Sequence, residues 1–177
     1  YGLDTVSRRM YTIYIKDLTT GEILPELINN TGAGAAWAND SRTFFYVQKE
    51  PGTLRYYKIF RHSLVTDESE DVEIYHEADE TFSTYVYRSK SDQYIMIASY
   101  QTLSSEYRYL NADDPEGEFR IFNPRQRDHE YSIEHFDDKF YVVTNWDAMN
   151  FRLMETPVGK TNQENWKEVI AHRPDVM

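Results

Sequence analysis

The chain has 177 residues, no cysteine and a formal net charge of −11 at pH 7. Without cysteine it has no disulfide framework, thiolate metal site or cysteine nucleophile, which fits a reducing compartment and a cytoplasmic location. The acidic balance argues against nucleic acid as a partner, because phosphates bind basic surfaces. The sequence contains neither a continuous apolar run of 18 residues nor a basic-then-apolar leader, so we expect no membrane span or retained signal peptide.

Two strands are predicted at the start of the chain, over residues 9–18 and 26–29, with the polar turn Thr19-Thr20-Gly21-Glu22 between them. Their Tyr, Ile and Leu residues suit a pleated, half-buried surface, whereas Gly, Asn and Asp mark the connections. Compared with the units that follow, this first unit lacks two inner strands. Residues 1–30 are therefore predicted to form a half blade, and Gly32-Ala33-Gly34 a turn that leads into the next strand.

Three full units of one four-stranded pattern follow. The aromatic residues that open their second strands are Phe44, Tyr94 and Phe140, separated by 94 − 44 = 50 and 140 − 94 = 46 positions. This period fits the roughly 40 to 50 residues of a β-propeller blade. The predicted strands are 35–38, 44–47, 55–61 and 72–75; 84–87, 94–97, 106–110 and 118–122; and 130–133, 140–143, 151–155 and 167–171.

The fold is accordingly predicted to be all-β, a β-propeller fragment of about three and a half four-stranded blades. The full blades are expected at residues 33–76, 82–122 and 129–172. Only residues 162–169 show a helix-like pattern. An open arc of blades exposes sheet edges, so two copies are expected to self-associate through them. The acidic stretches 67–71 and 77–80 are interpreted as solvated loops.

Motifs for catalysis or cofactor binding are not found. The sequence has no Gly-x-Ser-x-Gly elbow and no phosphate-binding Gly-rich loop. His129 and His135 would lie about 20 Å apart on one strand, too far to share a metal ion. Residues 111–117 resemble the start of a calcium loop, but Pro115 stands at a ligand position. We therefore predict no metal and no cofactor.

Several short segments together resemble one family. They are Asp17-Leu18-Thr19-Thr20-Gly21, Pro25-Glu26-Leu27, Trp37-Ala38-Asn39-Asp40-Ser41, Arg61-His62 and Pro124-Arg125-Gln126-Arg127-Asp128-His129-Glu130-Tyr131-Ser132. The combination is similar to the propeller of oligopeptidase B, or protease II, a branch of the prolyl oligopeptidase family of serine peptidases. The resemblance covers nearly the whole chain.

The resemblance implies a seven-bladed propeller that covers an α/β-hydrolase domain and admits short peptides for cleavage after Arg or Lys. The catalytic Ser, Asp and His would belong to that second domain, so this chain alone is expected to be inactive. Its expected partners are the rest of the propeller, the hydrolase domain and short basic peptides. Its acidic balance would raise the local concentration of such peptides.

The candidate contact residues are a dense charged run between two blades and one tryptophan. The run comprises Arg125, Arg127, Asp128, His129 and Glu130, and Trp146 follows the strand 140–143. We expect them to contact substrate or the second domain, and the alternative is a solvated loop. Two other functions stay open, since fold does not fix function: a free-standing propeller that binds proteins or ligands as a scaffold, and an aromatic-rich carbohydrate-binding domain.

Overall fold

The computed structural model describes residues 1–175, which contain fourteen β-strands, two short 3-10 helices and no α-helix. The predicted all-β fold is confirmed. The elements are β1 Gly2–Leu3, β2 Tyr11–Lys16, β3 Ile23–Trp37, β4 Thr43–Lys49, β5 Tyr56–Ser63, η1 Glu68–Glu70, β6 Val72–His76, β7 Ser83–Arg88, β8 Tyr94–Gln101, β9 Ser104–Asn111, β10 Arg120–Asn123, β11 Tyr131–Phe136, β12 Lys139–Thr144, β13 Arg152–Pro157, η2 Gln163–Asn165 and β14 Lys167–Ile170. The helix-like residues 162–169 form η2 and the start of β14.

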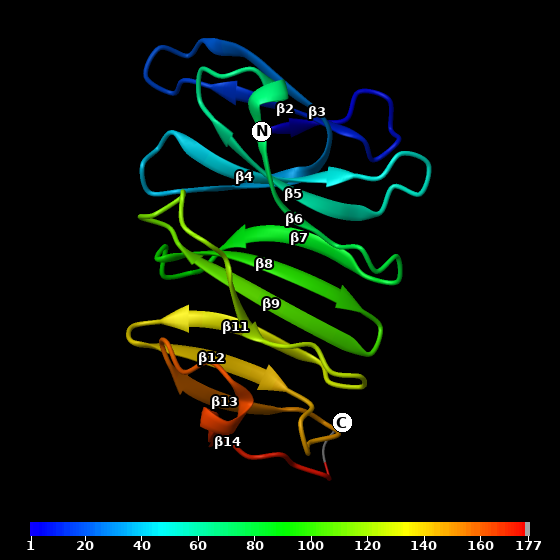
Figure 1. Ribbon diagram of the computed structural model, residues 1–177, viewed down its shortest axis with the longest axis vertical. Helices are drawn as coiled ribbons and strands as arrows, with labels where there is room; N and C mark the ends of the chain where they lie inside the picture. The colour runs from blue at the N-terminus through cyan, green and yellow to red at the C-terminus, as the bar shows by residue number, and fades with distance from the viewer. Residues whose placement is uncertain (176–177) are drawn as a thin grey trace. The chain divides into compact units, whose positions relative to one another are not determined.

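The strands form three sheets, in the orders β1-β2-β3-β4-β5-β6, β10-β9-β8-β7 and β11-β12-β13-β14. Figure 1 shows β11 to β14 as successive neighbours of one such sheet. Phe44, Tyr94 and Phe140 lie at or next to the first residues of β4, β8 and β12, as the repeat predicts. The division into blades at residues 1–30, 33–76, 82–122 and 129–172 stays a prediction. By backbone contacts the chain divides into two compact units, Tyr1–Tyr87 and the residues from Arg88 onward.

In the first unit, the 15-residue strand β3 joins what the sequence analysis treats as two strands and a turn. Its residues from Ile23 to Thr31 pair with β2, and those from Thr31 to Trp37 pair with β4. Gly32 lies inside the strand, where an added Cβ would come within 2.7 Å of a Val47 methyl carbon. Gly32 therefore permits close packing between strands, and the predicted turn is wrong.

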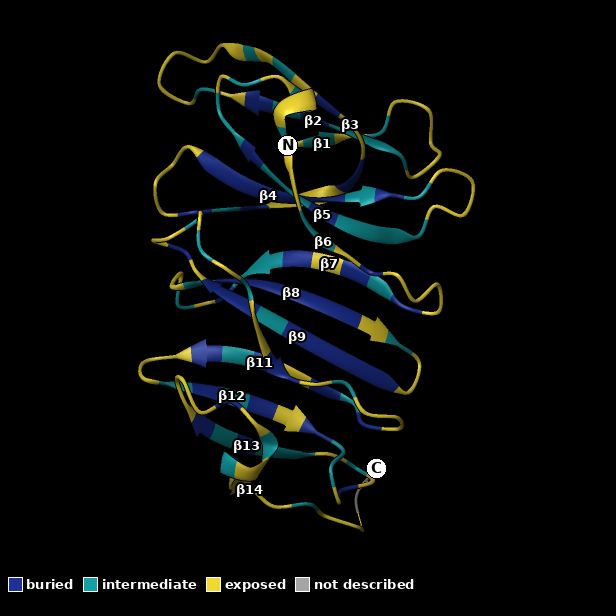
Figure 2. Cartoon of the chain, in the orientation of Figure 1, coloured by how far each residue is buried: buried dark blue, intermediate teal, exposed yellow. Residues whose placement is uncertain are grey.

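The core of the first unit is aliphatic and aromatic. Ile13, Ile15, Ile28, Phe44 and Tyr46 form one buried cluster. Figure 2 shows β4 buried along most of its length, because Thr43 to Val47 are all buried. Consecutive buried residues indicate that both faces of this strand are covered.

The second unit has an aromatic core. The Phe140 ring lies 5.3 Å from that of Tyr94, 5.2 Å from Tyr109 and 5.1 Å from Phe122, measured between centroids. Trp166 packs against Phe122 at 6.2 Å and is 6% exposed. Such tilted and edge-to-face pairs stabilise a core beyond the area that they bury.

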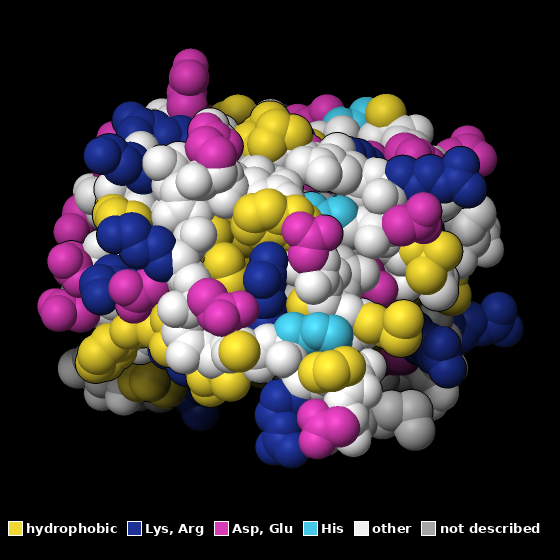
Figure 3. Space-filling view, turned by 90° about the horizontal axis from the view of Figure 1, so that it is seen from below, with side chains coloured by type: hydrophobic (Ala, Val, Ile, Leu, Met, Phe, Trp, Pro, Cys, Tyr) yellow, Lys and Arg dark blue, Asp and Glu magenta, His cyan; other side chains and the backbone are white. Residues whose placement is uncertain are grey.

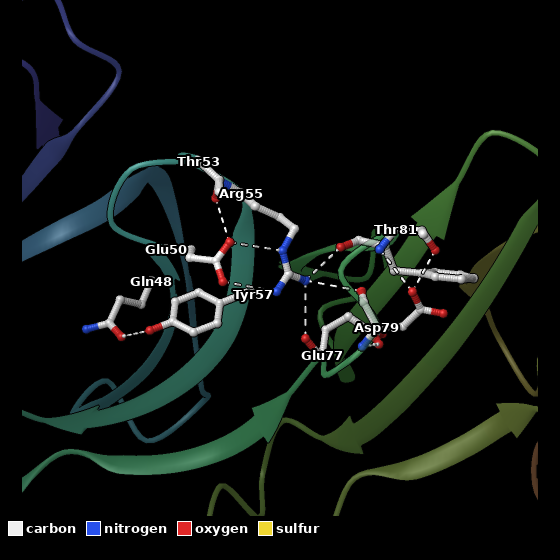
Figure 4. A network of polar contacts seen from close by, with 9 residues as sticks. Gln48, Glu50, Thr53, Arg55, Tyr57, Glu77, Asp79 and Thr81 are labelled. Carbon is white, nitrogen blue, oxygen red and sulfur yellow. Dashed lines mark hydrogen bonds and ion pairs between the residues drawn. The ribbon is translucent and has the colours of Figure 1, made fainter.

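The loop between β6 and β7 is held by one arginine (Figure 4). The Nη1 atom of Arg55 donates to the backbone carbonyls of Glu77, Asp79 and Phe82, at 3.0 to 3.2 Å. Its Nε lies 3.4 Å from the Glu50 carboxylate. A guanidinium can serve several acceptors because its donors point in fixed, divergent directions.

The two acidic stretches are less solvated than the sequence suggests. The Asp71 side chain is 2% exposed and accepts from Tyr46 and His62. Glu77 is 3% exposed, and its carboxylate accepts from the Tyr75 hydroxyl and the Asp79 amide. The interpretation of these stretches as solvated loops is therefore wrong for Asp71 and Glu77, since both carboxylates are buried and accept hydrogen bonds that a linear sequence does not reveal.

Candidate functional site

The predicted charged run connects β10 to β11 in the second unit, and its first residue is anchored to β9. The Arg125 amide donates to Glu106 Oε2 at 3.0 Å, and its guanidinium Nη2 lies 3.3 Å from Glu106 Oε1. The same carboxylate oxygen pairs with Arg108 at 2.7 Å. Because the Glu106 side chain is 6% exposed, these are charge-assisted contacts with little competition from water. Arg125 therefore fixes the loop and does not project from it.

The other end of the run is anchored to the end of β12. The buried His129 ring contacts the Thr144 hydroxyl through Nε2 at 2.9 Å, and burial lowers the pKa of this imidazole. The Glu130 amide donates to Asn145 Oδ1 at 2.9 Å, and Asn145 Nδ2 donates to the Asp128 carbonyl at 3.2 Å. His129 and Glu130 thus position the backbone.

The middle of the run faces solvent. The side chains of Arg127 and Asp128 are 94% and 64% exposed and form a loose ion pair at 3.6 Å. Asp128 has a φ of 61°, a conformation that Asp tolerates better than most residues. A loop that is fixed at both ends and carries one exposed charge pair can contact a partner with little loss of conformational entropy.

Trp146 packs beside this loop in a half-buried position. Its ring lies 6.2 Å from that of Trp166 in an edge-on arrangement, and the Arg152 guanidinium lies over it at 5.1 Å. Trp166 also contacts His129 at 5.9 Å. The structure therefore brings His129 and Trp146 around one tryptophan, while Arg127 and Asp128 point away into solvent.

Within residues 1–175, which the structure describes, no three His, Cys, Asp or Glu side chains converge closely enough to hold a metal ion. Across the same residues, no helix has the length and apolarity that crossing a bilayer requires. On the face drawn in Figure 3, acidic, basic and hydrophobic side chains are interspersed, so the net negative charge is not gathered there.

A pocket that the sequence did not predict lies in the first unit, between β3 and the end of β5. It has a volume of about 600 Å³, and His62 lies in its wall. The lining residues come from 24–28 and 62–68, two segments that are far apart in the sequence. Neither segment carries a recognisable binding motif, and only the shared sheet reveals that they meet.

Comparison with known proteins gives one family for the whole chain. The model of the prolyl oligopeptidase N-terminal β-propeller domain matches residues 1–177. A dipeptidyl aminopeptidase BI of Pseudoxanthomonas mexicana is 41% identical over 177 residues, which are 99% of this chain and 24% of that protein. A protease 2 of Moraxella lacunata is 31% identical over 150 residues, 84% of this chain and 22% of that protein.

Solved structures agree with this family. Oligopeptidase B from Leishmania major superimposes with a TM-score of 0.88 and 26% identity, over 97% of this chain and 24% of that one. Oligopeptidase B from Trypanosoma brucei, in a closed form with covalently bound antipain, gives 0.85 and 26% over 98% and 24%. This chain spans about a quarter of the length of these relatives. It belongs to the prolyl oligopeptidase family and has the fold of that family's N-terminal β-propeller domain.

Proposed function

We propose that this chain is the non-catalytic propeller segment of a serine oligopeptidase. The observation that carries this proposal is the match of the propeller family model to all 177 residues. Because relatives of known sequence are about four times longer, the rest of such a protein would supply the remaining blades and an α/β-hydrolase domain with the catalytic triad. The absence of cysteine supports a cytoplasmic location for that protein.

In this proposal the propeller limits which substrates reach the active site. Propeller sheets with packed cores form a rigid wall, so a folded protein is excluded while a flexible peptide passes when the domains open. The anchored loop with Arg127 and Asp128 at its tip is the part of this chain that we assign to contact with the catalytic domain or the peptide.

The proposed substrates are short peptides that are cleaved after Arg or Lys. Two lines support this: two of the solved structures that match are named oligopeptidase B, and one of the relatives is named protease 2. The formal charge of −11 favours cationic peptides over anionic ones.

A substrate series on the longer protein that carries this chain tests the proposal. One Arg-containing cleavage site would be placed in unstructured peptides of about 10 and about 50 residues, and kcat/KM measured for each. We expect the short peptide to be cleaved much faster. Equal values for the two lengths would contradict size filtering, and a reading frame with no hydrolase domain beyond residue 177 would overturn the peptidase assignment.

A second activity is favoured by the relative at 41% identity, whose name is dipeptidyl aminopeptidase BI. In that case the protein would release dipeptides from a free amino terminus. Paired substrates with free and acetylated amino termini separate the two activities. Cleavage of the acetylated peptide supports the endopeptidase, and cleavage of the free form alone supports the aminopeptidase.

We further propose that open sheet edges let copies of this chain associate. The edge strands of the three sheets are β1 and β6, β7 and β10, and β11 and β14. Unpaired strand edges are templates for pairing with another chain. Sedimentation velocity over a range of concentrations would show a dimer if this holds, and a monomer at every concentration would contradict it.

A further inference from the structure

The pocket in the first unit lies beside the part of β3 that does not pair with β4. Residues of β3 before Thr31 pair only with β2, so their other edge faces the chain that follows β5. The pocket occupies this space. Its lining residues are Leu24, Pro25, Glu26, Leu27, Ile28, His62, Val65, Thr66, Asp67 and Glu68.

Two hydrogen-bonded contacts hold the walls together. Glu26 Oε1 accepts from the Val65 amide at 2.5 Å, which ties β3 to the turn after β5. The Glu68 carboxylate accepts from the backbone and side-chain nitrogens of Asn29, both at 3.4 Å. The pocket is therefore bounded by joined elements on both sides.

Two of the residues that line this space, His62 and Glu26, each carry a buried polar atom without a hydrogen-bond partner. His62 is 0% exposed, and its Nδ1 lies 2.7 Å from Asp71 Oδ1, whose other oxygen accepts from the Tyr46 hydroxyl at 2.8 Å. A carboxylate opposite Nδ1 places a ring proton there, and in the neutral imidazole this makes Nε2 an acceptor. Among the described residues, neither His62 Nε2 nor Glu26 Oε2 has a hydrogen-bond partner, and both atoms are buried.

Unsatisfied buried acceptors are rare in folded proteins and call for a donor. The charge of the lining residues favours a cationic donor, because they include the carboxylates of Glu26, Asp67 and Glu68 and no Lys or Arg. The remaining wall is apolar, with Leu24, Leu27 and Val65 among its side chains. A metal ion does not fit, because no three metal-ligating side chains converge within residues 1–175.

We propose that this pocket binds an organic cation, a guanidinium or ammonium group on a short aliphatic stem. The cationic head would donate N–H bonds to His62 Nε2 and Glu26 Oε2, and the stem would lie against Leu24, Leu27 and Val65. The same chemistry has two sources: a free cation or basic peptide, and a Lys or Arg side chain of the longer protein that carries this chain.

The test uses the longer protein and agmatine, a guanidinium on a four-carbon stem, with butylurea as the uncharged analogue. Binding is measured by calorimetry at constant ionic strength, and the Tm of each variant is recorded with and without agmatine. Glu26→Gln removes the negative charge but keeps an oxygen for the Val65 amide. Glu22→Gln is the matched control, because Glu22 is exposed, lies just before β3 and does not line the pocket.

A free cation is the source if agmatine binds saturably to the wild type and to Glu22→Gln, with at least tenfold weaker binding to Glu26→Gln. A side chain of the longer protein is the source if agmatine does not bind, Glu26→Gln has a lower Tm than Glu22→Gln, and a crystal structure places a Lys or Arg in the pocket. Three results would overturn the proposal: equal weakening in both variants, butylurea binding as tightly as agmatine, or no agmatine binding together with an unchanged Tm.

Discussion

Arg55 shows how one side chain can determine the path of a loop. Its side chain is 11% exposed and serves a carboxylate together with three backbone carbonyls of residues 77–82. Those carbonyls lie outside any sheet, and the Asp79 carbonyl also accepts from the Phe82 amide at 3.0 Å. Removing the guanidinium would take a charged donor from the partly buried carbonyls of Glu77 and Phe82, and a lost hydrogen bond costs more where water replaces the donor poorly.

We therefore predict that Arg55→Lys lowers the free energy of unfolding by about 2 kcal/mol, because an ammonium group cannot reach all of these acceptors at once. Urea denaturation measures this change, and limited proteolysis should show faster cleavage within residues 77–82. Arg127→Lys is the matched control, since its side chain is 94% exposed, and it should stay within about 0.5 kcal/mol of the wild type. Equal stability of the two variants would refute the role of Arg55.

His129 predicts a pH dependence of stability. Burial lowers its pKa, so the native ring stays neutral at pH values where the unfolded chain, with a pKa of about 6.5, binds a proton. The free energy of unfolding should therefore fall as the pH drops below about 6.5, by up to about 1.4 kcal/mol per pH unit from this residue. His129→Gln should flatten this slope in urea titrations between pH 6.5 and 5. The exposed His76→Gln is the control, and an unchanged slope in His129→Gln would contradict the prediction.

At the scale of elements, β3 joins two pairing regions, and its glycines are not equivalent. A Cβ on Gly32 would lie 2.7 Å from Val47 Cγ1 and 3.0 Å from Tyr56 Cε1, whereas a Cβ on Gly34 would have no atom within 4 Å. Gly32→Ala should thus destabilise the protein by about 1 to 3 kcal/mol through overpacking. Gly34→Ala should be neutral or stabilising by up to about 1 kcal/mol. Urea midpoints for the pair measure the difference, and similar midpoints would show that the β3–β4 contact adapts.

Elements with strong local patterns were predictable from the sequence. Aromatic and β-branched runs at a period of about one blade place β4, β8 and β12, because side-chain alternation and polar turns are local features. The continuity of β3 was not predictable, since glycines signal a turn unless the neighbouring strand is known. In the candidate site, the charged run could be found by its composition. The sequence does not show that Arg125 and His129 are anchors while Arg127 is exposed. Their partners Glu106 and Thr144 come near only in the folded sheets.

The pocket shows the same limit. Glu26 and His62 lie 36 positions apart, and no spacing rule connects residues on different strands of an antiparallel sheet. Asp71 belongs to a run of acidic residues whose composition predicts a solvated loop, yet its carboxylate is hydrogen-bonded to two buried side chains. Long-range pairing therefore determines the chemistry at this position, and the sequence pattern determines only that a strand is there.

At the scale of the whole molecule, the net charge of −11 predicts an effect of salt on peptide capture. The Debye screening length falls from about 10 Å at 0.1 M salt to about 3 Å at 1 M. For the longer protein we expect kcat/KM for a cationic peptide to fall several-fold between low and high ionic strength, because steered association weakens, while kcat stays nearly constant. A peptide with the same cleavage site and acidic flanks should show the opposite trend.

A triple variant separates the charge of this chain from that of the rest of the protein. Glu22, Glu80 and Glu164 are exposed, and replacing each with Gln changes the formal charge from −11 to −8. If the chain contributes to steering, the slope of log kcat/KM against ionic strength should become shallower in this variant, with kcat unchanged. An unchanged slope would assign the effect to charges outside these residues, and a wild-type enzyme insensitive to salt would reject steering altogether.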